Sequence, residues 1–108
     1  MTEQEKVIVV FTTCPDEKVG VQISKTLVEE GLAACVNRVP GVVSTYIWGG
    51  TVHEDQEQLL LIKTTEANFD AVKMRLLPLH PYELPELIAI PVCAGAENYL
   101  DWVRHNVK

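Results

Sequence analysis

The spacing of hydrophobic positions changes several times along the chain and predicts alternating strands and helices. Residues 7–12 form a β-branched run that is apolar at consecutive positions, which is typical of a strand covered on both faces. Over residues 13–31 the apolar side chains recur at helical spacing, which predicts an amphipathic helix. Pro15 is expected in the first turn of this helix and Gly31 at its C-terminal cap.

Two long extended segments follow and predict a β-hairpin. The first covers residues 32–48, and its Pro-Gly step at residues 40–41 is expected to form a bulge. A glycine pair at residues 49–50 signals a tight turn, and residues 51–64 form the return strand. Each arm is about twice the usual length of roughly 5–6 residues, so the hairpin should project beyond its own sheet. A long exposed edge invites pairing with another chain, which favours a closed homo-oligomer.

The second half of the chain predicts a helix over residues 66–79, a strand over 87–92 and a closing helix over 97–105. The full order is β-α-β-β-α-β with a C-terminal helix, which predicts an α+β, ferredoxin-like sandwich in one domain over residues 1–108.

The strands at residues 7–11 and 59–62 are apolar on both faces, although the helices of such a fold cover only one face of the sheet. In a chain this short, another subunit is the readiest cover for the second face. This argument for oligomerisation is independent of hairpin length.

Composition excludes several classes of protein. Hydrophobic residues make up 47% and charged residues 22% of the chain, as in an ordinary globular domain. The net charge is -6, and the acidic excess is the same over residues 1–40, 41–80 and 81–108, so no basic face is indicated. We therefore expect no nucleic-acid or membrane partner. No stretch approaches the roughly 18 apolar residues that a transmembrane helix needs.

The N-terminal segment and the cysteines indicate a cytoplasmic protein. Residues 1–6 are acidic and lack the apolar stretch of a signal peptide. Cys14, Cys35 and Cys93 are widely spaced and include no Cys-x-x-Cys motif. We therefore expect reduced thiols rather than disulfides or a structural zinc site.

The sequence does not indicate an enzyme. Its glycines match no nucleotide-binding fingerprint, and it has no nucleophile elbow or paired-histidine helix motif. Cys35 and His80 could meet as a thiol–imidazole pair, but any cysteine and any histidine offer that pattern.

Cys35 and His80 each allow two interpretations. Cys35 lies among small residues on a strand and is either a packed core thiol or a soft metal ligand at a pocket wall. His80 lies at a helix end and is either a hydrogen-bonded cap or a ligand for copper or zinc. His53 stands beside several acids, which suits a solvated strand end better than a cation site.

Lys63 follows four apolar residues in a strand that should be well covered. Such a lysine must reach water or find a carboxylate, and Glu83 or Glu86 would serve. A lysine–glutamate pair beside a tyrosine would form a polar pocket of the kind that binds small ligands. The candidate pocket residues are Lys63, Tyr82, Glu83, Glu86 and Trp48.

Several motifs resemble the CutA divalent-cation tolerance proteins, in the same order and with similar spacing over nearly the whole chain. They are Pro15-Asp16-Glu17, Leu32 to Asn37, Trp48-Gly49-Gly50, Ile62 to Thr65, His80 to Glu86 and Tyr99 to Trp102. The most specific part is the string His-Pro-Tyr-Glu-x-Pro-Glu taken together with Leu-Ala-Ala-Cys.

This resemblance implies a tight, intertwined cytoplasmic homotrimer in which the long hairpins pair between subunits. It also implies binding of divalent metal ions, copper above all, with no cofactor required. His80 matches the family's metal-linked histidine, and Cys35, Lys63, Tyr82 and Glu86 match family positions. Because interlocked strands bury apolar surface in each other, we expect the trimer to resist heat.

Two functions follow as hypotheses. The first is a metal-binding protein of divalent-cation tolerance, with His80 as the main ligand, Cys35 as the second, and Glu83 and Glu86 as helpers. The second rests on an architectural similarity to the PII signalling proteins. It is a sensor or adaptor that holds a small ligand in a pocket between subunits.

Overall fold

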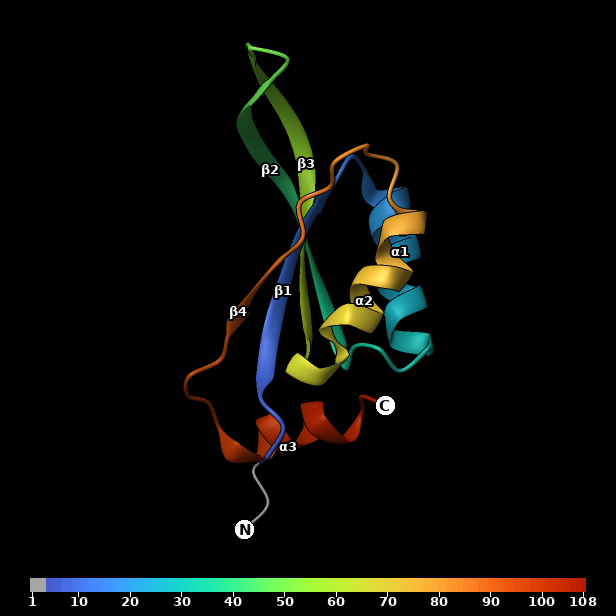
Figure 1. Ribbon diagram of the computed structural model, residues 1–108, viewed down its shortest axis with the longest axis vertical. Helices are drawn as coiled ribbons and strands as arrows, with labels where there is room; N and C mark the ends of the chain where they lie inside the picture. Colours follow the sequence, from blue (N-terminus) through green and yellow to red (C-terminus); the bar gives the residue numbers. More distant parts are fainter. Residues whose placement is uncertain (1–3) are drawn as a thin grey trace.

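The computed structural model describes residues 4–108, and its elements follow the predicted order (Figure 1). The strands are β1 (Val7–Cys14), β2 (Cys35–Trp48), β3 (Thr51–Thr65) and β4 (Ile88–Pro91). The helices are α1 (Glu17–Glu29), α2 (Phe69–Leu76) and α3 (Glu97–His105), and the 3₁₀ turns η1 (Glu66–Asn68) and η2 (Leu77–Leu79) flank α2. Residues 1–3 of the segment in which we expect no signal peptide lie outside the described residues.

The four strands form one antiparallel sheet in the order β2-β3-β1-β4, which confirms the α+β, ferredoxin-like prediction. Helices α1 and α2 cover one face of this sheet, and α3 lies across the end at which β1 begins (Figure 1). The core between the layers is fully buried at Val10, Ile62, Ile23, Leu27 and Leu76. Among residues 4–108, no helix has the length and apolar character to cross a bilayer.

The β2–β3 hairpin projects well beyond the rest of the sheet, as its length predicts (Figure 1). Strands β2 and β3 stay paired as far as Trp48 and Thr51, whereas β1 stops pairing with β3 at Gln58. The register shifts between Val39 and Val42, so the predicted bulge at the Pro-Gly step is confirmed.

The ends of α1 differ in detail from the prediction. Asp16 is the N-cap, and its Oδ1 accepts a hydrogen bond of 2.9 Å from the backbone N–H of Val19. Pro15 therefore precedes the helix, and its predicted place in the first turn is wrong. Gly31 has a φ of 72°, which confirms that it ends the helix in the left-handed conformation.

β2 begins at Cys35, three residues later than predicted. The N–H groups of Leu32 and Ala33 both donate to the carbonyl oxygen of Leu27, at 2.9 and 3.2 Å. Because these bonds complete the last turn of α1, the two residues are held against the helix and not in the sheet.

The face of the sheet that the helices leave bare is apolar, as the doubly apolar strands predict. We call this surface the open face. It carries Val9, Phe11, Leu59, Leu61, Ile88 and Ile90, which alternate with residues buried beneath the helices. Ile88 and Ile90 are 56% and 48% exposed in the single chain. That another subunit covers the open face stays a prediction.

Candidate functional site

The residues predicted to form the site separate into two groups. Cys35 and Lys63 lie directly opposite each other on β2 and β3. Trp48, Tyr82 and Glu86 instead line a groove beside the projecting hairpin. Glu83, also predicted, is exposed and lies outside the lining of this groove.

Lys63 does not pair with a glutamate. Its Nζ donates a hydrogen bond to the side-chain oxygen of Asn37, so the predicted pairing with Glu83 or Glu86 is wrong. Asn37 lies two residues beyond Cys35 on β2 and therefore on the same face as Lys63. The ammonium group of Lys63 therefore bonds to an acceptor on the neighbouring strand and not to a carboxylate from the segment that follows α2.

His80 is only 7% exposed, and both of its ring nitrogens are engaged. Nε2 lies 2.8 Å from the carbonyl oxygen of Thr13, which can only accept, so Nε2 carries the proton. Nδ1 then accepts a longer bond of 3.2 Å from the backbone N–H of Tyr82. Both ring nitrogens are therefore hydrogen-bonded, as one interpretation of His80 expects, and its role as a metal ligand stays a prediction. A metal ion would have to take Nδ1, in place of the bond from Tyr82.

The described residues of one chain do not bring together a complete set of metal ligands. Among residues 4–108, no group of three or more His, Cys, Asp and Glu side chains is arranged to hold a metal ion. Cys35 is half-buried on the open face and lies opposite Lys63, which in turn lies opposite Val9 on β1. His80 instead bonds to Thr13, which lies four residues beyond Val9 on the same strand. At about 3.3 Å per residue, this distance keeps Cys35 and His80 apart.

The groove lies between the β2 arm of the hairpin and the segment that leads into β4, and it encloses about 690 Å³. We call it the arm groove. Its lining comprises Thr13, residues 44–48, Glu57, Tyr82 and residues 84–88. It therefore joins aromatic and apolar side chains to two carboxylates.

Glu57 is the functional candidate that the sequence does not single out. Its side chain is only 8% exposed, and its Oε2 accepts a hydrogen bond of 2.7 Å from the hydroxyl of Tyr82. Desolvation and this bond to a carboxylate both raise the pKa of Tyr82 well above its usual value. The sequence could have identified Glu57 from its position, because Glu57 alternates in step with Leu59 and Leu61 along β3 and so points to the open face.

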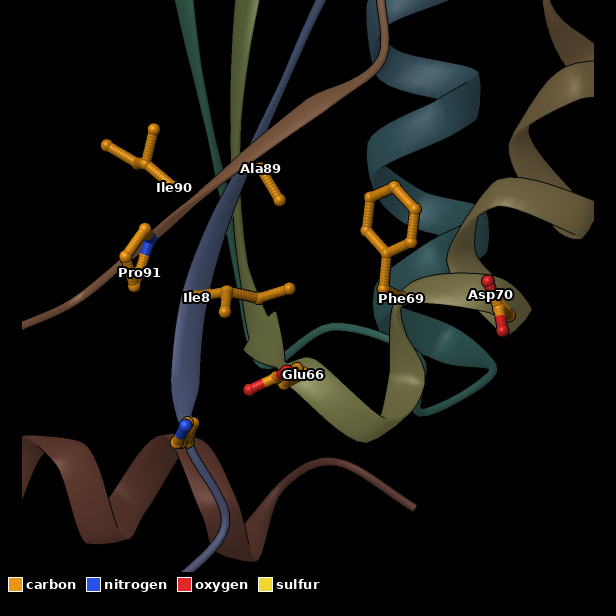
Figure 2. A pocket seen from close by; sticks show the side chains of 8 residues that line it. Ile8, Glu66, Phe69, Asp70, Ala89, Ile90 and Pro91 are labelled. Carbon is orange, nitrogen blue, oxygen red and sulfur yellow. The ribbon is translucent and has the colours of Figure 1, made fainter.

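A second cavity of about 620 Å³ lies between β1, β4 and α2 (Figure 2). Apolar side chains of Ile8, Phe69 and Ala89 face it, and the carboxylates of Glu66 and Asp70 stand at its margin. None of the residues predicted for the site lies here.

Comparison with known proteins gives the family. The family model for the CutA1 divalent ion tolerance protein matches residues 8–106. The chain belongs to the CutA1 family. It is 55% identical over 98 residues to the divalent-cation tolerance protein CutA of Thermus thermophilus, covering 91% of this chain and 95% of that protein. Protein CutA of Homo sapiens is 47% identical over 94 residues, which are 87% of this chain and 52% of the human protein.

Solved CutA1 structures have the same fold. The divalent cation tolerance protein of Thermus thermophilus superposes with a TM-score of 0.92 at 53% identity, over 94% of this chain and 99% of that one. CutA1 from Oryza sativa gives a TM-score of 0.93 at 40% identity, over 96% and 95% of the two chains. The chain spans about half the length of the chloroplastic and mammalian CutA proteins that it resembles, at 52–57% of each.

Proposed function

We propose that this CutA1 protein acts in divalent-cation tolerance as a cytoplasmic homotrimer that binds divalent metal ions, copper first among them, without catalysing a reaction. Its similarity to the Thermus thermophilus tolerance protein over nearly the full length of both chains carries this proposal. Divalent-cation tolerance is the function that this relative's name states.

The apolar open face and the projecting hairpin support assembly. Both features leave apolar surface and unpaired backbone groups on a single chain, which a closed ring of copies would cover. Burying that surface in neighbouring subunits would also give the expected resistance to heat.

His80 and Cys35 remain the proposed metal ligands, with Glu83 and Glu86 as helpers. Imidazole and thiolate are donors that copper favours. Because one chain does not bring these ligands together, the proposal requires that a metal site be completed by residues of neighbouring subunits.

Native mass spectrometry on untagged protein, purified without chelator and then exposed to copper, tests both parts. We expect a trimer that carries about one copper ion per subunit. In His80→Gln the amide can still donate to Thr13, so the trimer should persist while the copper is lost. The matched control, His53→Gln, changes an exposed histidine and should keep the metal. Equal copper occupancy in both variants would contradict the metal role of His80.

A second candidate function is a sensor that binds a small ligand in the arm groove. The nearly buried carboxylate of Glu57, placed in a cavity with aromatic walls, favours it. Its first test is an organic mass that stays bound to the oligomer in the same spectra.

A further inference from the structure

Hydrogen bonds fix His80 on three sides. Its backbone N–H donates to the carbonyl oxygens of Leu76 and Leu77, at 3.1 and 3.2 Å, which ties it to the end of η2. Its side chain bonds through Nε2 to Thr13 on β1 and accepts the backbone N–H of Tyr82 at Nδ1. Because His80 is only 7% exposed, a metal ion reaches a ring nitrogen only if one of the two side-chain bonds opens.

The bond at Nε2 is the one that the sheet needs. β4 pairs with β1 only as far as Phe11, so Thr13 lies two residues beyond the end of β4. The Nε2–H of His80 takes the place of a strand partner there by donating to the Thr13 carbonyl oxygen at 2.8 Å. A metal ion on Nε2 would leave this oxygen without its donor. The longer bond at Nδ1 therefore opens at lower cost.

Nδ1 is also the nitrogen that suits a metal ion. Histidines that bind metals almost always donate their other ring N–H to a carbonyl or carboxylate oxygen, which fixes the tautomer. His80 already has this arrangement, because Thr13 holds the proton on Nε2. The imidazole thus fits the ligand role proposed above in its tautomer and in its type of donor. Among the described residues, the group that occupies Nδ1 is the backbone N–H of Tyr82.

The Tyr82 N–H belongs to a stiff turn. This turn, residues 80–86, contains two prolines that restrict its backbone, so one peptide group does not move aside alone. The rings of His80 and Tyr82 pack with centroids 4.8 Å apart, and the Tyr82 hydroxyl donates to Glu57 at 2.7 Å. We call this arrangement the closed turn. Freeing Nδ1 requires that the closed turn open.

We propose that the closed turn and a metal ion on His80 exclude each other. The Tyr82 N–H holds Nδ1 while the turn is closed, and opening of the turn frees Nδ1 for copper. This inference rests on the metal role of His80 proposed above and names how that site is regulated. The apparent affinity for copper is then the intrinsic affinity reduced to the fraction of chains in which the turn is open.

Hydrogen–deuterium exchange of the native oligomer tests this exclusion without any substitution. The exchange rate of the Tyr82 amide is measured by mass spectrometry with and without saturating copper, and Pro81, which has no amide hydrogen, simplifies its assignment. We expect the rate to rise about fivefold or more with copper, because the acceptor of this N–H is then taken. In His80→Gln, copper should leave the rate unchanged.

Tyr82→Phe tests the same coupling from the other side. The substitution removes the bond to Glu57 that helps to keep the turn closed, and it leaves His80 in place. We expect Tyr82→Phe to bind copper about fivefold more tightly than the wild type, in competition with a chelator of known affinity. The matched control Tyr99→Phe removes a hydroxyl on α3 and should leave the affinity unchanged.

The outcomes separate this proposal from the metal role on which it rests. If copper is lost in His80→Gln but leaves the Tyr82 amide of the wild type as protected as before, the exclusion is overturned and the metal role stands. Copper that binds equally to the wild type and His80→Gln overturns both. Equal affinities of the wild type and Tyr82→Phe would show that opening of the turn does not limit binding, which also overturns the proposal.

Discussion

At the scale of single residues, the contact between the Tyr82 hydroxyl and Glu57 is the most enclosed polar contact of the arm groove. Tyr82→Phe removes the donor and leaves a nearly buried carboxylate with no partner. We expect the free energy of unfolding, measured in urea at fixed chain concentration, to fall by about 1–2 kcal/mol.

Tyr46→Phe is the matched control for this change. The Tyr46 hydroxyl donates to Asp55, which lies exposed on the hairpin arm, so water replaces the lost bond and the free energy of unfolding should fall less than in Tyr82→Phe. Equal losses in the two variants would show that the enclosure of Glu57 does not strengthen its bond to Tyr82.

The raised pKa of Tyr82 also predicts how stability changes with pH. In the unfolded chain the phenol titrates near its usual value of about 10, whereas in the folded chain it keeps its proton to higher pH. Its contribution is therefore complete below about pH 10 and is lost as the pH rises further. We expect the free energy of unfolding to fall more steeply above this pH in the wild type than in Tyr82→Phe. The raised pKa values of Cys14 and Tyr46 are common to both proteins and cancel in the comparison.

The polar partners of single residues were the least predictable part of the site. The sequence identified Lys63 as a lysine that needs an acceptor, but the strand register alone decided that Asn37 supplies it. Glu57 resembled its exposed acidic neighbours in the sequence. It became buried because a segment far along the chain, at Tyr82, crosses the end of β1 and covers it.

At the scale of elements, prediction succeeded because periodicity and turn chemistry are local. The helix α3, the turn at Gly49 and Gly50 and the bulge after Val39 all occur at their predicted positions. The start of β2 was missed because Leu32 bonds back to α1, and hydrophobic spacing does not record which backbone bonds an apolar residue makes.

The C-terminal end of α1 gives a prediction at this scale. Gly31 has a φ of 72°, a conformation that side chains with a Cβ disfavour. We expect Gly31→Ala to lower the free energy of unfolding by about 1–2 kcal/mol. Gly31→Asn should recover part of the loss, because asparagine tolerates the left-handed region while meeting the same Lys108 side chain. Equal losses would assign the cost to contact with Lys108 instead of backbone strain.

At the scale of the whole molecule, the open face and the arm groove are linked. Glu57 points to the same side of the sheet as Leu59 and Leu61, so any copy that covers the open face approaches the groove. The proposed assembly and the proposed ligand binding would therefore share a boundary. Conditions that change the oligomeric state should then change the affinity for a ligand in the groove.

Leu61 lies near the middle of the open face, between Phe11 on β1 and Asn37 on β2. Leu61→Asp places a charge on this face without entering the core beneath the helices, so each chain should stay folded by circular dichroism. We expect light scattering after gel filtration to show the mass of a single chain. The reason is that the free energy needed to bury a carboxylate between subunits exceeds the free energy gained by association. Met74→Asp, at a 74% exposed position on α2, should leave the oligomer intact. An assembly of unchanged mass in Leu61→Asp would show that the open face is not the surface through which the copies associate.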